Sequence, residues 1–180
     1  MKRQKYIALL RGINVGGHTV KMDDLKKALE SIGLKNVKTL LASGNAAFDV
    51  EFEKKGEEIL ALKIENVLKK KFGFNIPVIL RSESELIKLV KSDPFHGIKV
   101  TPQTRLYVTF LKSAQKAKAI KIPYSTQGGE FRILKATSSE IISVLHLEEG
   151  KRTPDLMIVV EKEFGKEVTT RNWNTVLKLI

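Results

Sequence analysis

The chain has 180 residues, of which 42% are hydrophobic and 29% are charged. This is the composition of a globular protein with room for one domain or two small subdomains. The chain has no cysteine, which excludes disulfides, thiolate metal sites and cysteine nucleophiles. Its apolar runs are too short to span a membrane or to form the core of a signal peptide. We therefore expect a cytoplasmic protein that does not insert into a membrane.

The formal net charge is +12, and the excess of lysine and arginine is spread over both halves of the sequence. A charge of this size makes binding of a polyanion plausible. The alternative is that a lysine-rich surface only keeps the protein soluble. Lysine greatly outnumbers arginine, the better marker of specific phosphate recognition, so both interpretations stay open.

Residues 5–81 predict the element order βαββαβ. Each expected strand is a short apolar run, and each expected helix carries apolar residues at helical spacing. Asp23 or a neighbour is expected to cap the first helix, and Pro77 favours an edge position for the fourth strand. Ser82 and Glu85 predict a capping box for a further helix that continues to Val90. The expected strands are 5–10, 37–42, 46–50 and 76–80, and the expected helices are about 23–32 and 54–71.

The second half predicts a degenerate copy of this order, βαββα, followed by a closing helix that opens at Thr170. Arg171 and Asn172 are then expected to be exposed in the first turn of that helix. The expected elements are a strand at 106–111, a helix at 113–122, a hairpin of 130–134 with 140–147, and a helix from about 153 to 164.

We therefore predict an α+β protein of two ferredoxin-like subdomains with antiparallel sheets and a C-terminal helix. Residues 1–91 form the first subdomain with a connecting helix, 92–104 form a linker, and 105–180 form the second subdomain. In a ferredoxin-like sheet of strand order 4-1-3-2, the loop after strand one and the turn between strands two and three lie at the same edge. Residues 12–21 should therefore lie beside residues 43–45, with Gly73 at that edge too.

This edge concentrates groups that suit anions. Glycine-rich backbone presents N–H groups, and a helix begins directly after the loop, so phosphate is the favoured ligand. The glycine spacing matches neither a Walker loop nor the dinucleotide fingerprint. Alternatively, the glycines only permit a tight turn and the asparagines bond to local backbone. The candidate ligand-binding residues are Arg11, Gly12, Asn14, Gly16, Gly17, His18, Lys21, Ser43, Gly44, Asn45, Arg171 and Asn172.

Other candidate sites have weaker support. The three histidines are far apart in the sequence without ligand spacing, so we expect no metal and no other cofactor. Asp23 and Asp24 suit helix capping better than acid–base chemistry. Trp173 offers either a stacking platform for a base or a core aromatic. The expected central strands lack most of the stacking aromatics of RNA-recognition modules.

Several blocks along the chain have a recognisable pattern. They are Tyr6 to Gly17, Met22 with Leu25, Ser43-Gly44-Asn45 with Phe48, Asp93-Pro94-Phe95, Tyr107 to Leu111 and Thr170 to Leu179. With these blocks the sequence resembles the family called domain of unknown function 1697. The resemblance spans nearly the whole chain and implies two ferredoxin-like subdomains, with no assigned activity. Residues 150–156 depart from the family pattern.

Three functional hypotheses follow. The first is a protein that binds phosphate-bearing ligands, nucleic acid foremost, through the glycine-rich edge. The second is a small-molecule enzyme or nucleotide-phosphate binder at the same edge, with His18 as a proton carrier. The third is a structural or regulatory protein without a small ligand. The residues identify neither a catalytic group nor an oligomeric state.

Overall fold

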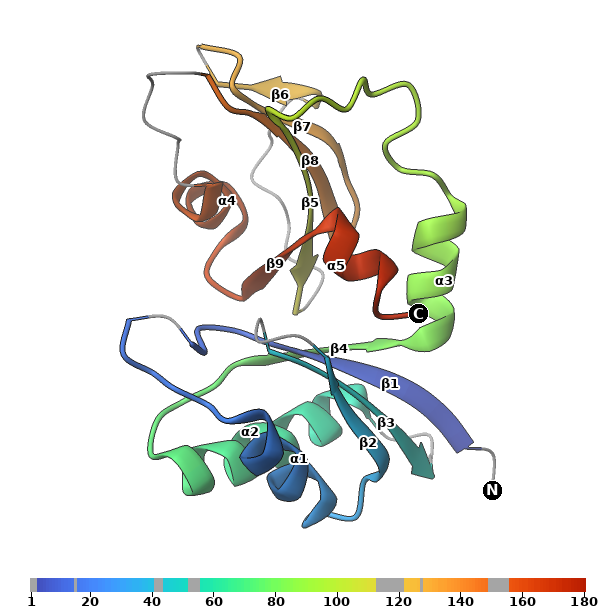
Figure 1. Ribbon diagram of the computed structural model, residues 1–180, viewed down its shortest axis with the longest axis vertical. Helices are drawn as coiled ribbons and strands as arrows, with labels where there is room; N and C mark the ends of the chain where they lie inside the picture. Colours follow the sequence, from blue (N-terminus) through green and yellow to red (C-terminus); the bar gives the residue numbers. More distant parts are fainter. Residues whose placement is uncertain are drawn as a thin grey trace. The chain divides into compact units, whose positions relative to one another are not determined.

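The computed structural model describes residues 3–14, 16–40, 44–51, 56–112, 122–126, 128–148 and 156–180. The chain forms two compact units, residues 1–88 with 179–180 and residues 89–178. Each unit contains one antiparallel sheet (Figure 1). No helix in the described part of the chain is long and apolar enough to cross a membrane.

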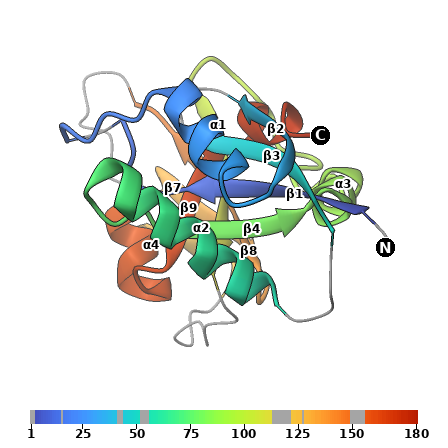
Figure 2. The ribbon, with the colours of Figure 1, turned by 90° about the horizontal axis from the view of Figure 1, so that it is seen from below.

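The first unit is a ferredoxin-like βαββαβ fold, as the sequence predicts. Its sheet has the order β2-β3-β1-β4, with antiparallel neighbours throughout. Helices α1 and α2 cover one face of this sheet, which is visible from below in Figure 2. The elements are β1 (Arg3–Leu10), α1 (Met22–Glu30), β2 (Lys35–Leu40), β3 (Asn45–Glu51), α2 (Glu57–Phe72) and β4 (Val78–Ser82).

The core of this unit follows from alternation along the strands. Tyr6, Ala8 and Leu10 on β1 all point to the helix-covered face, because successive side chains of a strand point to opposite sides. There they pack against Leu25 of α1 and Ile64 of α2, both of which are fully buried. This packing fixes the end of β1 and the start of α1, between which the glycine-rich loop runs.

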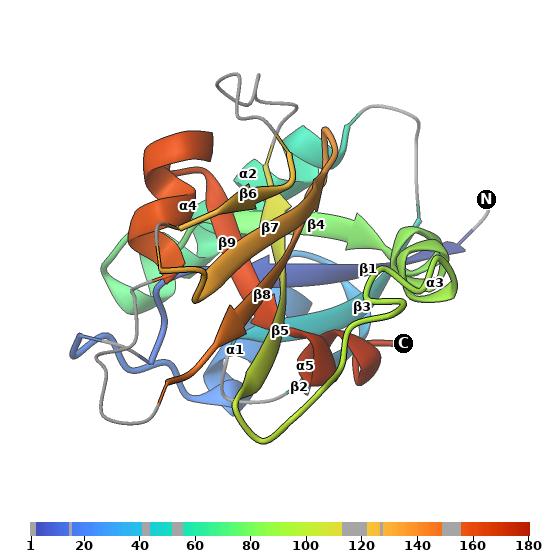
Figure 3. The same cartoon turned by 90° about the horizontal axis from the view of Figure 1, so that it is seen from above.

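The second unit also contains an antiparallel sheet, of order β6-β7-β8-β5-β9, and α4 packs on one of its faces (Figure 3). The hairpin expected near residues 130–147 is confirmed as β7 and β8. The elements that follow β4 are α3 (Glu83–Lys91), β5 (Thr104–Leu111), β6 (Tyr124–Ser125), β7 (Phe131–Ala136), β8 (Glu140–His146), α4 (Leu156–Phe164), β9 (Val168–Asn172) and α5 (Trp173–Leu177).

The strand β9 corrects the sequence prediction. We expected a helix to open at Thr170, but residues 168–172 pair with β5, and Val108 lies opposite Arg171. Val168, Thr169 and Thr170 are consecutive β-branched residues, which favour a strand. The segment is otherwise polar, so its hydrophobic pattern did not indicate one. With β9, the second unit completes a ferredoxin-like order. The expected helix at 113–122 and the expected helix start at 153–155 lie outside the described residues, except Ile122.

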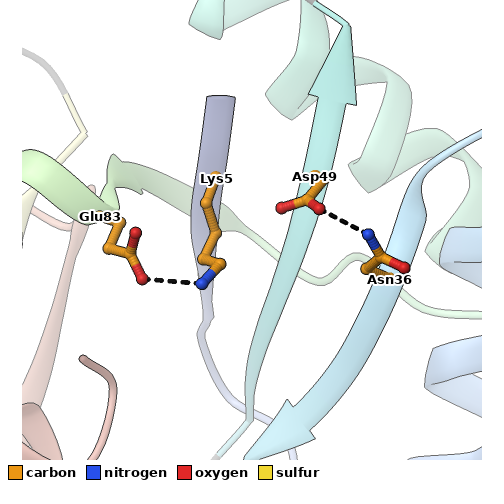
Figure 4. A network of polar contacts seen from close by, with 4 residues as sticks. All are labelled: Lys5, Asn36, Asp49 and Glu83. Atoms are coloured by element: carbon orange, nitrogen blue, oxygen red, sulfur yellow. Dashed lines mark hydrogen bonds and ion pairs between the residues drawn. The ribbon is translucent and has the colours of Figure 1, made fainter. Parts of the chain in front are cut away.

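Two polar contacts tie the strands together at the end of the first sheet that is remote from the glycine-rich loop (Figure 4). Lys5 Nζ donates to Glu83 Oε1 at 2.9 Å, and Asn36 Nδ2 donates to Asp49 Oδ2 at 2.6 Å. The hydrogen bond with Glu83 raises the pKa of Lys5. Both contacts are exposed to solvent, so each adds little to stability.

The predicted capping box at the start of α3 is confirmed. The backbone N–H of Ser82 donates to Glu85 Oε2 at 2.7 Å, and the backbone N–H of Glu85 donates to Ser82 Oγ at 3.3 Å. Two N–H groups that the helix start leaves without intrahelical partners are thus satisfied reciprocally. The helix therefore begins directly where β4 ends.

We predict that Tyr6→Phe lowers the free energy of unfolding by about 1 kcal/mol at pH 7. Tyr6 is 2% exposed, and its hydroxyl donates to Glu57 Oε1 at 2.9 Å. Burial and the bond to Glu57 raise the pKa of Tyr6. The contribution of the neutral phenol is therefore complete below the unfolded-state pKa of about 10 and is lost as pH rises above it. Urea unfolding at pH 7 and at pH 11 should show the parent and the variant converging, and a constant difference would contradict the assignment.

Candidate functional site

The structure brings together the three segments that the predicted topology places at one edge. The backbone N–H of Leu10 donates to the carbonyl of Gly44 at 2.8 Å, and the N–H of Arg11 donates to the carbonyl of Pro77 at 3.0 Å. We call residues 11–14, 16–21, 44–45 and 73–77 the glycine edge. The predicted proximity of the loop to Gly44 is therefore confirmed. The ring of Phe74, the residue after Gly73, lies 4.3 Å from the His18 ring. Pro77 directly precedes the edge strand β4.

A close contact between Ile13 and Gly44 seats the loop on the turn. Ile13 is 5% exposed. A Cβ atom on Gly44 would lie 2.7 Å from Ile13 Cδ1, and Gly44 has a φ of +78°. Both the space and the backbone conformation therefore require glycine at position 44. The Ile13 side chain occupies the volume that any other residue there would need.

The loop folds around Asn14. The backbone N–H of Asn14 donates to the carbonyl of His18 at 2.6 Å, and Asn14 Oδ1 accepts from the N–H of Val20 at 2.9 Å. Asn14 itself has a φ of +56°, and Gly16 and Gly17 have φ values of +60° and +87°. The Asn14 side chain thus holds the loop in shape, which agrees with the interpretation that the asparagines bond to local backbone.

The outer surface of the loop presents donors and positive charge. Gly16, Gly17 and His18 are exposed. Within the described residues, the N–H groups of Gly16 and Gly17 have no hydrogen-bond partner. Lys21 is exposed at the N-cap position of α1, and the His18 ring lies 4.3 Å from the Phe74 ring, centroid to centroid.

The start of α1 differs from the prediction that Asp23 or a neighbour caps it. Lys21 is the N-cap residue, and it makes no side-chain capping bond. Asp23 and Asp24 lie inside the first turn, where their charges complement the helix dipole. Asp24 also pairs with Lys71 of α2 at 3.4 Å between Oδ1 and Nζ.

One polar residue of the predicted turn, Asn45, is buried, unlike the exposed loop. Asn45 is fully buried, and its Nδ2 donates to the carbonyl of Leu40 at 3.0 Å. This bond closes the β2–β3 connection and keeps the amide away from the exposed surface. Ser43, the other polar candidate in this turn, lies outside the described residues.

Arg171 and Asn172 belong to the second unit. The expectation that Arg171 is exposed was wrong, because it lies on β9 with 6% exposure, and its Nη1 donates to Thr169 Oγ1 at 2.8 Å. Burial lowers the pKa of Arg171 to about 10, so the side chain stays charged at neutral pH. Asn172 is half-buried and caps α5, where its Oδ1 accepts from the N–H of Asn174 at 2.9 Å.

A lysine-walled groove between α1 and α2 is a feature that the sequence analysis missed. It has a volume of about 430 Å³, and its lining comprises Lys27, Ala28, Ser31, Val67, Lys70 and Lys71. Lys70 and Lys71 lie in the last turn of α2. Placing both helices on one face of the sheet would have shown that these lysines line a groove with Lys27. The groove begins next to the glycine edge, since Lys71 is two residues from Gly73.

No group of three or more histidine, aspartate or glutamate side chains that could hold a metal ion occurs within the described part of the chain. Among the groups that the glycine edge exposes are backbone donors and the cation of Lys21.

Residues 3–136 match the model of a family described as "Protein of unknown function (DUF1697)". The fold is similar to that of conserved bacterial protein SP0830 from Streptococcus pneumoniae, with 20% sequence identity and a TM-score of 0.72 over 99% of this chain and 97% of that chain. At this identity the similarity concerns the fold alone. A comparison with curated proteins gave no match.

We predict that Gly44→Ala destabilises the protein more than Gly12→Ala. Both glycines have positive φ, +78° and +70°, so each substitution carries a similar backbone strain of about 1–2 kcal/mol. Only position 44 adds a collision, with Ile13 Cδ1, which should cost about 1–3 kcal/mol more. Urea unfolding of both variants measures the difference.

The Ile13→Ala background tests the cause. Removing the Ile13 side chain should reduce the extra cost of Gly44→Ala, because the two positions are directly coupled. Equal costs at positions 12 and 44, or a cost at 44 that is unchanged by Ile13→Ala, would show that the contact does not seat the loop.

Proposed function

This chain belongs to the family described as Protein of unknown function (DUF1697), and we propose that it binds phosphate-bearing ligands, nucleic acid foremost, through its glycine edge. The observation that carries the proposal is the exposed pair Gly16 and Gly17, whose N–H groups lack partners within the described residues and which lie in the loop that leads to Lys21. Backbone N–H groups and a nearby cation are the combination that binds phosphate oxygens.

The loop supports the proposal better than the start of α1 does. The first turn of α1 carries Asp23 and Asp24, whose negative charges oppose an anion at that helix end. Lys71 offsets the charge of Asp24 through their ion pair, but Asp23 is exposed. We therefore assign the phosphate contact to Gly16, Gly17 and Lys21, with His18 beside them, and give Asn14 and Asn45 a structural role.

The lysine-walled groove favours a polymer over a single phosphate. Lys27 and Lys70 line a groove that begins next to the glycine edge, so positive charge continues along α1 and α2. Lys71 lines the groove too, with its charge offset by Asp24. A chain of phosphates engages such a series of cations, whereas a mononucleotide engages one end of it. The net charge of +12 supports attraction of a polyanion from a distance.

We also propose a cytoplasmic location, where nucleic acid is accessible. The absence of cysteine from the sequence is consistent with it. Cell fractionation of the native host with an antibody against the chain tests this, and recovery outside the cytoplasmic fraction contradicts it.

We predict salt-sensitive binding of a labelled single-stranded oligonucleotide, measured by fluorescence anisotropy. If three phosphates are neutralised, affinity should fall roughly 20-fold between 50 and 200 mM salt. Lys21→Ala and Lys70→Ala should each weaken binding and reduce the salt slope by about 1. Lys35→Ala is the matched control, because it removes the same charge from an exposed position at the other end of β2 from the glycine edge.

A flat salt response, or no binding of mixed RNA and DNA at low salt, would contradict the proposal. Equal weakening by Lys35→Ala and Lys21→Ala would show that only net charge matters. A mononucleotide that raises the melting temperature as much as the oligonucleotide, with a rise that Lys21→Ala abolishes, would favour the small-ligand alternative at the glycine edge.

Gly16→Val tests the backbone contribution without changing charge. Gly16 has a φ of +60°, and a Cβ atom added there has open space around it, so valine should act chiefly by straining the loop backbone. We predict roughly fivefold weaker oligonucleotide binding for each backbone hydrogen bond lost, at about 1 kcal/mol each. Unchanged affinity in a variant that has kept its fold would exclude the loop backbone from the site.

A further inference from the structure

A cavity of about 220 Å³ lies in the second unit, where β5 begins and β9 passes into α5. The antiparallel pairing of the two strands places these positions at the same end of the sheet, since Tyr107 lies opposite Asn172. The loop before β5 adds Val100, which is 63% exposed. The other lining residues are Thr104, Arg105, Leu106, Asn172, Trp173 and Asn174.

The polar groups around this cavity are only partly used by the protein. Arg105 Nη1 donates to the carbonyls of Pro102 and Thr104 at 2.6 and 3.1 Å. These bonds fix the guanidinium, while its Nε and Nη2 have no partner among the described residues. The carboxamide of Asn174 likewise has no partner within the described part of the chain. Asn172 uses its Oδ1 as the cap of α5 and retains its Nδ2 as a donor.

The Trp173 ring, which forms the aromatic wall of the cavity, packs against Phe95. Phe95, which is 7% exposed, meets the Trp173 ring edge-on, with centroids 5.2 Å apart and planes at 63°. Trp173 is only half-buried. Its indole contacts the buried Phe95 and also lines the cavity. A pre-positioned aromatic ring with a few convergent polar groups is the usual make-up of a small-ligand site.

We propose that this cavity binds the base of a nucleoside 5′-phosphate, with the phosphate held by Arg105. The base would contact the Trp173 indole, and the amides of Asn172 and Asn174 would bond to its edge, since carboxamides both donate and accept. A single ring system suits the volume, which is below the roughly 300–1,000 Å³ of sites for larger ligands. No lining residue is acidic, so no charge opposes the phosphate. The inference concerns the second unit and does not depend on the glycine edge.

Trp173 is the only tryptophan of the chain, so its fluorescence reports on this cavity directly. AMP and UMP, titrated into the intact protein with correction for absorption by the base, should each quench the emission saturably. Ribose 5-phosphate, which lacks a base, should quench far less. A short single-stranded oligonucleotide should quench as well if the recognised nucleotide belongs to a polymer, and only the free nucleotides should quench if it does not.

Asn174→Ala is the main test variant, because Asn174 is exposed and its side chain supports no other residue within the described part of the chain. It should weaken AMP binding roughly five- to tenfold through lost hydrogen bonds. Arg105→Lys should weaken AMP binding although it keeps the positive charge, because lysine lacks the planar donor fork of arginine. Asn66→Ala, which changes an exposed asparagine of α2 in the first unit, is the matched control and should leave the titration unchanged.

The outcomes separate this site from the glycine edge. Quenching by AMP or UMP that Asn174→Ala weakens and Lys21→Ala leaves unchanged supports the cavity, whether or not oligonucleotides bind at the edge. No saturable quenching by either nucleotide, or equal quenching by ribose 5-phosphate, overturns it. Oligonucleotide binding that depends on Lys21, together with unchanged Trp173 emission on addition of AMP, UMP and the oligonucleotide, supports the glycine edge alone and overturns the cavity.

Discussion

The contact of Ile13 with Gly44 is the constraint on which the rest of the glycine edge depends. A strand end, a loop and a turn from distant parts of the sequence meet there because one position lacks a Cβ and another fills the space. The hydrogen bond from Leu10 to Gly44 fixes the strands at the same point. With the apolar side of the loop anchored, its polar backbone faces outward, and the exposed glycines at 16 and 17 follow from that orientation.

Structural and binding roles are divided among residues that look alike in the sequence. Asn14 and Asn45 hold the loop and the turn through backbone bonds, whereas the glycines and Lys21 remain on the surface. In the second unit, Arg171 is packed within the sheet, but Arg105 lies at a cavity with part of its guanidinium uncommitted. Residue type therefore suggests chemistry, while burial and hydrogen bonding decide which groups can meet a ligand.

The two units share more than an order of elements. β4 and β9 are each the last strand of a ferredoxin-like order, and each carries a buried arginine, Arg81 and Arg171. In both, Nη1 donates to the carbonyl of the preceding residue, at 2.7 Å in β4 and 2.9 Å in β9. A helix with a side-chain cap, from Ser82 or Asn172, follows directly. The equivalence became visible only once β9 was recognised as a strand.

The sequence by itself determined the first unit, its strand order and the meeting of the glycine loop with the β2–β3 turn, because local periodicity and glycine positions constrain the backbone directly. It also indicated the capping box at Ser82. Tertiary structure decided the rest. β9 is a strand because it pairs with the edge of β5. The polar residues of β9 do not by themselves predict a strand. The lysine-walled groove and the cavity at Trp173 form where segments far apart in the sequence pack together. A local sequence pattern does not specify which distant segments come together.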